Sequence, residues 1–271
     1  MIEVLAPGLL TTIQDLGRPG WAHTGVPPSG AADRPSLELG NRLVGNPPGA
    51  AALEATLIGP RLRFRDAALV ALTGAVGEAR TLKIDAGDEL DVGPLVGGVR
   101  AYVCVRGGID VEPVLGSRST DLLTGIGPPP LQAGDLIEIG TEPALQPELP
   151  PGPVPAGDAV LRIVPGPRED WFADPALAAL TASEWNVTPA SNRVGIRLAG
   201  PPLARARTEE LLSEGLVTGA LQVPPNGQPI LLLNDHPTTG GYPVIGVVDA
   251  ADLPALAQAR PGEKVRFHGS Q

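Results

Sequence analysis

Residues 229–248 read PILLLNDHPTTGGYPVIGVV, and this stretch shows most clearly how the chain is built. Its two apolar runs, 230–233 and 244–248, are each long enough to form a strand that is buried on both faces. The connection between them is rich in hydrogen-bonding groups, whereas a simple hairpin needs only two turn residues. Loops held by rigid strands often carry binding and catalytic side chains, although the same residue types also satisfy the backbone of ordinary surface turns. The stretch therefore predicts two core strands and a candidate functional loop at 234–242.

Short apolar runs separated by turns continue through the rest of the chain. A turn-and-strand motif, in which a glycine and an acidic residue precede an alternating strand, occurs at 86–93, 133–140 and 261–267. The 35 glycines and 32 prolines show no short period, so they are interpreted as turn residues between short strands. Small closed barrels often use such motifs. We therefore expect a mainly β fold with a few short helices.

Three short helices are predicted from capping and turn residues. Asp33 suits the N-cap of a helix at 36–44, because its carboxylate both accepts from the first backbone N–H groups and complements the helix dipole. The Asp174-Pro175 pair begins a second short helix. The third, at 253–259, is ended by a Pro-Gly pair.

Residues 141–158, TEPALQPELPPGPVPAGD, mark the expected domain boundary. They contain six prolines and no apolar periodicity, which is typical of a semi-rigid linker. The linker separates an N-terminal domain at 1–140 from a C-terminal domain at 159–271. Both halves open with a short strand broken by Pro and Gly, and both close with the turn-and-strand motif. This similarity between the two halves predicts two related barrels in tandem.

The composition disfavours several classes of function. Hydrophobic residues make up 42% of the chain, which is ample for a packed core. The 20 basic and 30 acidic side chains give a net charge of −10, which repels phosphate backbones and anionic lipid. We therefore expect no nucleic-acid or membrane partner. The N-terminal residues lack the pattern of a signal peptide, so a soluble cytoplasmic protein is expected.

Motifs for metal and nucleotide chemistry are missing from the sequence. The three histidines, His23, His236 and His268, show no ligand spacing, and a single cysteine cannot form a thiolate site, so no metal site is expected. That cysteine, Cys104, lies in an apolar run and is interpreted as a core residue rather than a nucleophile. No P-loop, Rossmann fingerprint or Gly-x-Ser-x-Gly elbow occurs.

Polar, turn-rich stretches are the remaining candidates for a functional site. Arg118, which lies among serines and a threonine, could hold a carboxylate or phosphate, or could instead pair with Asp121 at the surface. Glu214 and Asp235 could supply an acid/base pair, although Glu214 is equally well explained as a solvated side chain. Gln222 and Gln228 suit an amide substrate, or only their own backbone.

These stretches, taken in order, resemble one protein family over almost the whole chain. The family is known as the C subunit of 5-oxoprolinase, as allophanate hydrolase subunit 2, or as the biotin-dependent carboxyltransferase-like family. The resemblance is carried by PGLLTTIQDLGRPG (7–20), GVPPSGAAD (25–33), GGIDV (107–111), GSRST (116–120), LSEG (212–215), QVPPNGQP (222–229) and TTGGYP (238–243).

The resemblance implies both a fold and an activity. The fold is a pair of cyclophilin-like β-barrel domains. The activity is that of a 5-oxoprolinase, in which ATP, with Mg, phosphorylates the lactam oxygen of 5-oxoproline and water then opens the ring to glutamate. The implied partners are the B subunit of 5-oxoprolinase (allophanate hydrolase subunit 1) and often a separate A subunit, without which the chain is expected to be inactive.

Two alternatives to this activity stay open. One is a carboxyltransferase subunit of the allophanate hydrolase or urea carboxylase type, which acts on a urea-derived amide. The sequence has no biotin-attachment motif, so biotin would have to arrive on another protein. The other is a non-catalytic regulatory module that binds a kinase inhibitor, as some relatives do.

The resemblance also guides the assignment of site residues. Glu214 and Asp235 are predicted to orient the lactam or the attacking water. Substrate and ATP are predicted to bind Ser29, Asp33, Arg118, Ser119, Thr120, Gln222, Gln228, Thr238, Thr239, Gly240, Gly241 and Tyr242. We expect these loops to meet in one shared cleft. The chain departs from its relatives at three positions near the TTGGYP motif: relatives usually carry Arg or a similar residue in place of His236, Gln in place of Pro237, and often Lys or Arg in place of Val244. Ala32 stands where relatives commonly have Met, and the segment after 73–75 is shorter than usual.

Overall fold

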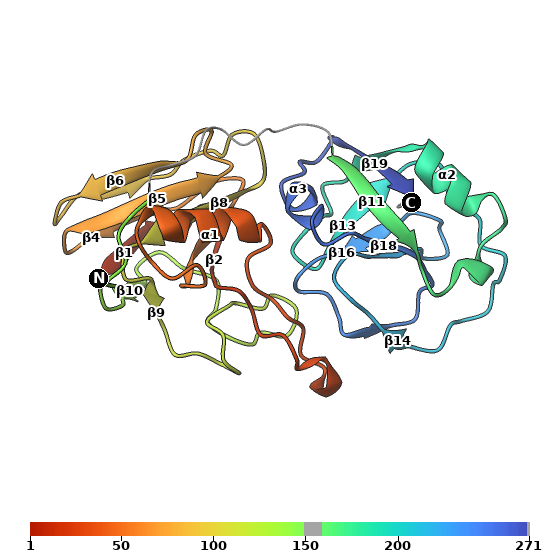
Figure 1. Cartoon of the computed structure of the whole chain (residues 1–271), viewed down its shortest axis with the longest axis horizontal. Coiled ribbons are helices and arrows are strands. Elements are labelled where there is room, and N and C mark those ends of the chain that lie inside the picture. Colours follow the sequence, from red (N-terminus) through yellow and green to blue (C-terminus); the bar gives the residue numbers. More distant parts are fainter. Residues whose placement is uncertain (149–158, 270–271) are drawn as a thin grey trace. The chain divides into compact units, whose positions relative to one another are not determined.

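The computed structural model of the chain describes residues 1–148 and 159–269, and these fall into two compact units (Figure 1). Unit 1 comprises residues 1–18 and 29–148, and unit 2 comprises residues 19–28 and 159–269. Most of the expected linker, 149–158, lies outside the described residues. Its first part, 141–148, belongs to unit 1, where Arg106 donates to the carboxylate of Glu142 at 2.6 Å and to the carbonyl of Pro143 at 2.8 Å.

Two antiparallel sheets make up the described part of unit 1. The first sheet has the strand order β7 (Glu89–Asp91), β4 (Arg61–Phe64), β1 (Ile2–Ala6), β10 (Leu136–Ile139) and β9 (Ile109–Asp110). The second has the order β2 (Leu10–Gln14), β3 (Ala52–Thr56), β8 (Arg100–Val105), β5 (Ala68–Gly74) and β6 (Arg80–Ile84).

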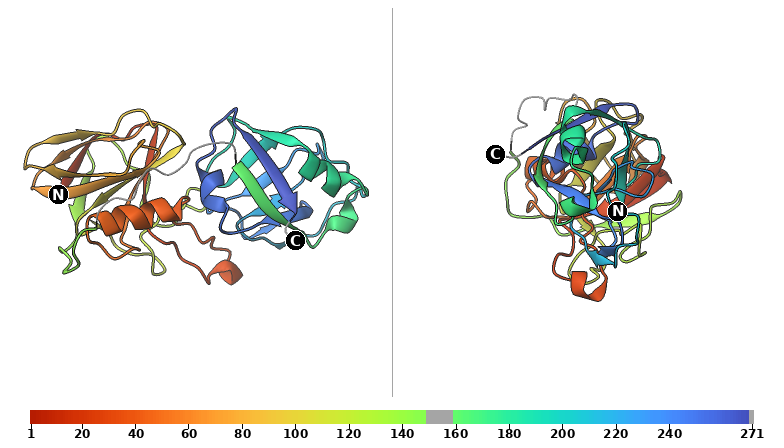
Figure 2. Two further views of the ribbon diagram at one scale, coloured as in Figure 1. Left: turned by 45° about the horizontal axis from the view of Figure 1, so that its top comes forward. Right: turned by 90° about the vertical axis from the view of Figure 1, so that its right-hand side faces the viewer.

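One core fills the space between these two sheets. Ile2 and Val4 alternate toward it from β1, and Val103 and Val105 point into it from β8. The intervening residues Tyr102 and Cys104 face the other way and pack against residues of α1 (Arg34–Leu43). Figure 2 shows this helix, in orange-red, along the strands of unit 1. Strand β8 is therefore buried on both faces, which explains its continuous apolar sequence.

Helix α1 begins where the sequence predicted a cap. The carboxylate of Asp33 accepts from the backbone N–H of Ser36 at 3.2 Å, which confirms its capping role. A proline lies in the first turn, where its missing N–H is not needed. Gly40 lets the helix lie directly on the sheet, because a Cβ at this position would lie 2.5 Å from the sulfur of Cys104.

A closed barrel of seven strands forms within the described part of unit 2. Its strand order is β11 (Ala159–Pro165), β18 (Val244–Val248), β15 (Ala220–Gln222), β16 (Ile230–Leu232), β13 (Gly195–Ala199), β12 (Glu184–Val187) and β19 (Lys264–Gly269). Strands β11 and β19 are parallel, and the other neighbours pair antiparallel. A separate two-stranded ribbon pairs β14 (Glu214–Gly215) with β17 (Thr239–Gly240).

Short helices accompany the barrel, and an apolar core fills it. These helices are α2 (Ala176–Ala182), α3 (Leu253–Ala257), η1 (Ala22–Thr24) and η2 (Glu169–Trp171). The core includes Trp185, whose indole N–H donates to the carbonyl of Leu180 at 3.0 Å at the end of α2. None of the helices in the described ranges is long and apolar enough to cross a bilayer.

The mainly β prediction is confirmed, and its local details have clear physical causes. The turn-and-strand motif precedes β7, β10 and β19, and its glycines Gly87, Gly134 and Gly262 have φ of +92°, +91° and +91°. This left-handed conformation costs glycine no steric strain, so each turn delivers the chain into a strand. The runs at 230–233 and 244–248 form β16 and β18 but are not neighbours, because β15 lies between them.

Candidate functional site

The 116–120 loop in unit 1 is organised around the buried carboxylate of Asp15, immediately after β2. Its Oδ1 accepts from the hydroxyls of Ser117 and Ser119, both at 2.6 Å, and from the N–H of Gly17 at 2.7 Å. Its Oδ2 accepts from the backbone N–H of Arg118 at 2.6 Å. Charge-assisted hydrogen bonds of this kind are strong, so Asp15 fixes the loop. The hydroxyl of Ser119 is thereby committed to the protein rather than open to a ligand.

The side chain of Arg118 reaches out from this fixed backbone. Its Nε donates to the carbonyl of Val111 at 2.7 Å, and its Nη2 pairs with Oδ1 of Asp110 at 3.1 Å. The partner is thus Asp110 and not Asp121, which instead caps a turn by accepting from the backbone N–H of Leu123 at 2.9 Å. The Arg118 side chain is 38% exposed, so it is held in place but stays accessible.

Thr120 and Gln14 carry buried polar atoms next to the same loop. The Gln14 amide donates to the carbonyl of Thr120 and to the hydroxyl of Thr12, both at 3.0 Å. Within the described residues, the Oγ1 of Thr120 and the Oε1 of Gln14 have no hydrogen-bond partner. Buried polar atoms without partners are uncommon, and each one calls for an explanation such as a bound ligand.

Ser29 and Asp33 lie in the loop that leads into α1. Ser29 has a left-handed φ of +52°, and its hydroxyl accepts from Nη1 of buried Arg18 at 3.1 Å. The N–H of Asp33 donates to the hydroxyl of Tyr102 at 2.8 Å, and this hydroxyl donates to Glu54 at 2.7 Å. Burial and the nearby Glu54 carboxylate raise the pKa of Tyr102 well above its usual value, so it stays a neutral donor. Asp33 therefore acts as a cap in this network, and its binding role stays a prediction.

In unit 2, the ribbon brings Glu214 beside the 238–242 loop. Glu214 is paired with Gly240, and the N–H of Leu216 donates to the carbonyl of Thr238 at 2.9 Å. The Glu214 carboxylate accepts two hydrogen bonds from Arg168, and the one from Nε measures 2.9 Å. These bonds lower the pKa of Glu214, so it is ionised at neutral pH. Such a carboxylate suits a base or an electrostatic role better than that of a proton donor.

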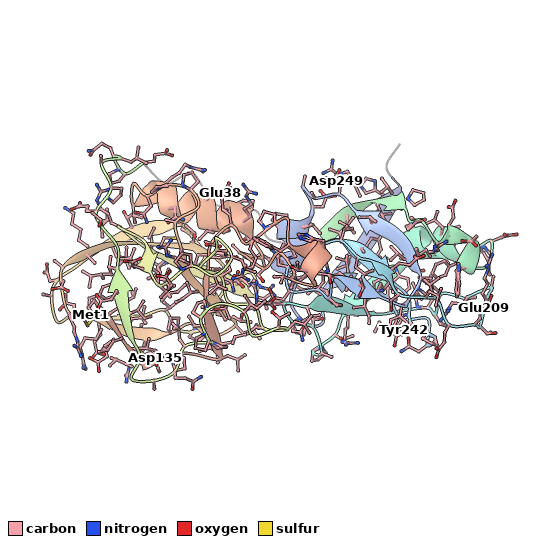
Figure 3. All side chains as sticks on the ribbon, turned by 90° about the horizontal axis from the view of Figure 1, so that it is seen from below. Met1, Glu38, Asp135, Glu209, Tyr242 and Asp249 are labelled. Atoms are coloured by element: carbon pink, nitrogen blue, oxygen red, sulfur yellow. The ribbon has the colours of Figure 1, made fainter. Side chains whose placement is uncertain are left out.

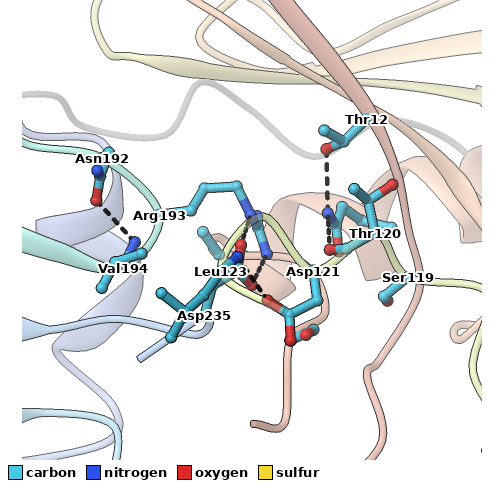
Figure 4. Close-up of polar contacts among 12 residues, drawn as sticks. Thr12, Ser119, Thr120, Asp121, Leu123, Asn192, Arg193, Val194 and Asp235 are labelled. Carbon is cyan, nitrogen blue, oxygen red and sulfur yellow. Dashed lines mark hydrogen bonds and ion pairs between the residues drawn. The ribbon is translucent and has the colours of Figure 1, made fainter. Parts of the chain in front are cut away.

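Asp235 is fully buried at the start of the same loop. Its two oxygens accept from Nε and Nη2 of Arg193 at 2.8 and 2.9 Å (Figure 4). Arg193 lies in an Asx turn, in which Oδ1 of Asn192 accepts from the N–H of Val194 at 2.9 Å. The bidentate pair favours a role in which Asp235 holds the loop, and the catalytic role assigned from the sequence stays a prediction.

The two glutamines bind backbone groups, in line with the simpler of the two sequence interpretations. Gln222 donates to the carbonyl of Tyr242 at 3.1 Å. Gln228 accepts from the N–H of Gly200 at 2.9 Å and donates to its carbonyl at 3.1 Å. A Cβ on Gly240 would lie 2.8 Å from Cδ1 of Leu216 and 2.9 Å from the amide nitrogen of Gln222, so these side chains would have to shift to admit one. The ring of Tyr242 is 45% exposed on the outside of unit 2 (Figure 3).

The departures from the family pattern have structural roles of their own. His236 is buried, and its Nδ1 lies 2.8 Å from the carbonyl of Pro237. Val244 opens β18 within an apolar cluster. Both side chains are thus packed into the protein.

The predicted residues form two groups, one in each unit. Arg118, Ser119 and Thr120 lie together in unit 1, and Glu214 lies against the 238–242 loop in unit 2. The prediction that both groups share one cleft stays a prediction. Sequence reasoning missed the side chains that position these groups, which are Asp15, Arg18, Glu54, Arg168 and Arg193. Glu54 carried a signal, because a single acid inside the apolar strand β3 implies a buried partner.

Comparison with known proteins identifies the class of protein. Residues 24–269 match the family described as carboxyltransferase domain, subdomain A and B, and the chain belongs to this family. It is 41% identical to the C subunit of 5-oxoprolinase from Escherichia coli K12 over 98% of this chain and 90% of that protein. It is 36% identical to the C subunit of 5-oxoprolinase from Haemophilus influenzae, with the same coverage of both chains. The resemblance expected from the sequence motifs is confirmed.

Solved structures show the same fold in larger proteins. The crystal structure of the K. lactis urea amidolyase matches with a TM-score of 0.91 and 32% identity over 100% of this chain. The present chain spans only 19% of the length of that enzyme. The fold described above is therefore one that also occurs within a much longer polypeptide.

Proposed function

We propose that this chain is the C subunit of an ATP-dependent 5-oxoprolinase, which opens 5-oxo-L-proline to L-glutamate. The observation that carries the proposal is the similarity to two proteins named as the C subunit of 5-oxoprolinase, which extends over nearly all of each chain. The word subunit in those names supports a need for partners, here the B and A subunits. We expect the chain alone to show no turnover.

The chemistry requires activation of a poor electrophile. A lactam carbonyl resists attack by water, and transfer of the γ-phosphoryl group to its oxygen makes the ring carbon reactive. The balanced reaction consumes 5-oxoproline, ATP and two water molecules and yields glutamate, ADP and phosphate. One water ends in the new carboxylate and amine, and the other ends in phosphate. The protein must position these groups and stabilise the charge as it moves.

The described side chains support a division of roles. Arg118 is exposed and offers N–H groups to an anion, and Thr120 offers a buried hydroxyl without a partner in the described part of the chain. In unit 1 these two side chains would hold one anionic group of the substrate or of MgATP. In unit 2, Thr238, Thr239 and the amides of Gly240 and Gly241 would hold another. Ionised Glu214 would accept a proton from water or from the lactam N–H. Ser119 and Asp235 would position their loops through Asp15 and Arg193.

Reconstitution tests this proposal. The purified chain is combined with the A and B subunits of the same organism, and glutamate is measured with 5-oxoproline in the presence and absence of ATP. Glutamate release that needs ATP and all three proteins supports the proposal. Turnover without ATP, or no turnover of 5-oxoproline by an assembled complex, contradicts it.

A matched pair of variants tests the role of Glu214. Glu214→Gln should lower kcat by about 10²-fold or more, the typical loss when a positioned base is removed. Glu184 is the control, because it is also a partly exposed carboxylate with a pKa lowered by basic partners, Lys264 and Arg266. Glu184→Gln should leave kcat within about twofold, since surface substitutions rarely propagate. Equal losses in both variants would show that Glu214 has no special role.

A urea-derived substrate is the second candidate. It is favoured by the urea amidolyase structure and by the 33% identity to the urea amidolyase of Lachancea kluyveri, of which this chain covers 17%. In this case biotin would be carried by another protein. Turnover of urea or allophanate by the complex, with none of 5-oxoproline, would establish it. Partner binding without turnover of any of these substrates would instead favour a regulatory role, with a kinase inhibitor as the partner to test.

A further inference from the structure

Unit 1 contains a surface cavity of about 240 Å³, broadly open to solvent, at the edge where β9 and β10 meet. Six of its lining residues bear on its chemistry, and these are Gly107, Gly108, Asp110, Arg118, Gly140 and Thr141. Pockets for drug-sized ligands run from about 300 to 1,000 Å³, so this one suits a smaller molecule.

Two of the glycines that line the cavity lie where no larger residue fits. Gly107 has a φ of +97°, and a Cβ there would lie 2.4 Å from the carbonyl oxygen of Gly140. A Cβ on Gly140 would in turn lie 2.6 Å from the carbonyl oxygen of Gly107. Two chain segments therefore approach as closely as only glycine allows.

Hydrogen bonds to buried groups hold the walls of the cavity in place. The N–H of Gly107 donates to Oδ1 of Asn46 at 2.8 Å, and the N–H of Gly140 donates to the carbonyl of Gly108 at 3.0 Å. The N–H of Ile109 donates to the carbonyl of Ala51 at 2.9 Å. Because these bonds join three segments of the chain, the cavity is preformed, as ligand sites usually are.

A cation and an anion lie side by side in the lining. Arg118 and Asp110 are paired at 3.1 Å, and their side chains are 38% and 58% exposed. Nε of Arg118 donates to the carbonyl of Val111, and this bond fixes the orientation of the guanidinium group. Within the described residues, Nη1 of Arg118, Oδ2 of Asp110 and the hydroxyl of Thr141 enter no hydrogen bond. Adjacent donors and acceptors of opposite charge thus remain available.

We propose that this cavity binds a small α-amino-acid-like ligand, in which a carboxylate lies next to an ammonium or amide N–H. The carboxylate binds the free N–H groups of Arg118, the nitrogen donates to Asp110, and Thr141 adds a hydroxyl. The class includes glutamate and 5-oxoproline. This choice of ligand rests on the proposed function, whereas the charge pattern and the size of the cavity do not.

Binding to the full chain, without ATP or partner subunits, tests the proposal by titration calorimetry. The probes are L-glutamate, 5-oxo-L-proline and glutarate, which keeps both carboxylates of glutamate but lacks its nitrogen. Glutamate should bind at least about tenfold more tightly than glutarate, because one charge-assisted hydrogen bond to Asp110 is lost. Asp110→Asn should abolish this difference. Equal affinity for glutamate and glutarate in the unaltered chain overturns the proposal.

Two further variants locate the binding. Arg118→Met should weaken both amino-acid-like probes by about 10- to 100-fold, and Ala50→Leu should do the same by filling the cavity while leaving both charges in place. Arg63→Met is the control, because Arg63 forms an equally exposed ion pair with Glu89 elsewhere in unit 1. Undiminished binding in Ala50→Leu, or no binding of either probe to the unaltered chain at millimolar concentrations, overturns the proposal.

These measurements also separate the cavity from the activity. Turnover of 5-oxoproline by the assembled complex, with no binding of the probes to this chain, would remove the cavity proposal and leave the proposed function intact. Specific binding of the probes in an assembly that turns over no 5-oxoproline would contradict the proposed function and leave the cavity proposal intact.

Discussion

Replacement of Asp15 by Asn should release the 116–120 loop. The Asp15 carboxylate accepts four hydrogen bonds at 2.6 to 2.7 Å, three at Oδ1 and one at Oδ2. An asparagine has nearly the same shape, and its amide oxygen can replace Oδ1. Its NH2 group then faces the backbone N–H of Arg118, so two donors meet and that bond is lost.

The expected cost follows from these four bonds. The unpaired N–H costs about 1–2 kcal/mol, because its water has been removed without replacement. The other three bonds change from charge-assisted to neutral, and each weakens by about 0.5–1 kcal/mol. The total loss is about 2.5–5 kcal/mol, a large part of the roughly 5–15 kcal/mol that stabilises an ordinary domain.

Urea titration followed by circular dichroism, together with hydrogen exchange of a peptide that covers 113–121, measures this effect. Asp15→Asn should lower the unfolding midpoint of unit 1 and speed exchange at Arg118. Asp66→Asn is the control, because Asp66 is also in unit 1 but is 74% exposed, and it should change the free energy of unfolding by less than about 0.5 kcal/mol. Unchanged exchange in 113–121 in the Asp15 variant would refute the assignment of this carboxylate as the organiser of the loop.

Three further results are expected. The pKa of Glu214 is lowered by its ion pair with Arg168, so this pair stabilises the fold above the unfolded pKa of about 4.3, and the stabilisation is lost as pH falls through the lower folded pKa. The free energies of unfolding of the unaltered chain and of Arg168→Met should therefore converge in acid. A constant difference between them at all pH values would contradict this. Burial raises the pKa of Cys104, so its thiol should react with iodoacetamide only after denaturation, and rapid labelling of the native chain would contradict its place in the core. Tyr102→Phe removes a hydrogen bond to buried Glu54 and should lower the free energy of unfolding by about 1.5–3 kcal/mol in urea titrations. An unchanged free energy of unfolding would show that this bond does not stabilise the fold.

Local features of this fold were readable from the sequence. The turn-and-strand motif predicted β7, β10 and β19, because a left-handed glycine and the strand after it depend only on neighbouring residues. The cap at Asp33 was predicted for the same reason. Cys104 was correctly interpreted as a core residue, since it alternates with valines in an apolar run.

Features that depend on distant pairing were not readable. Strands β16 and β18 were predicted, but the insertion of β15 between them depends on barrel closure rather than on their own residues. Asp15 and Ser119 are 104 positions apart, and Asp235 and Arg193 are 42 apart. A single sequence shows that Asp235 is acidic and lies in a loop, but not that an arginine occupies both of its oxygens. The candidate site was therefore found as a set of loops, while the side chains that hold those loops were missed.

The stoichiometry of the coupled reaction gives the clearest test of the proposed function. Glutamate and ADP are measured together in a mixture of this chain with the A and B subunits, and again with this chain omitted. One glutamate is expected for each ADP in the complete mixture, and neither product should form when this chain is left out. Glutamate formation at an undiminished rate without this chain, or ADP formation that does not depend on 5-oxoproline, would contradict its assignment to the 5-oxoprolinase complex.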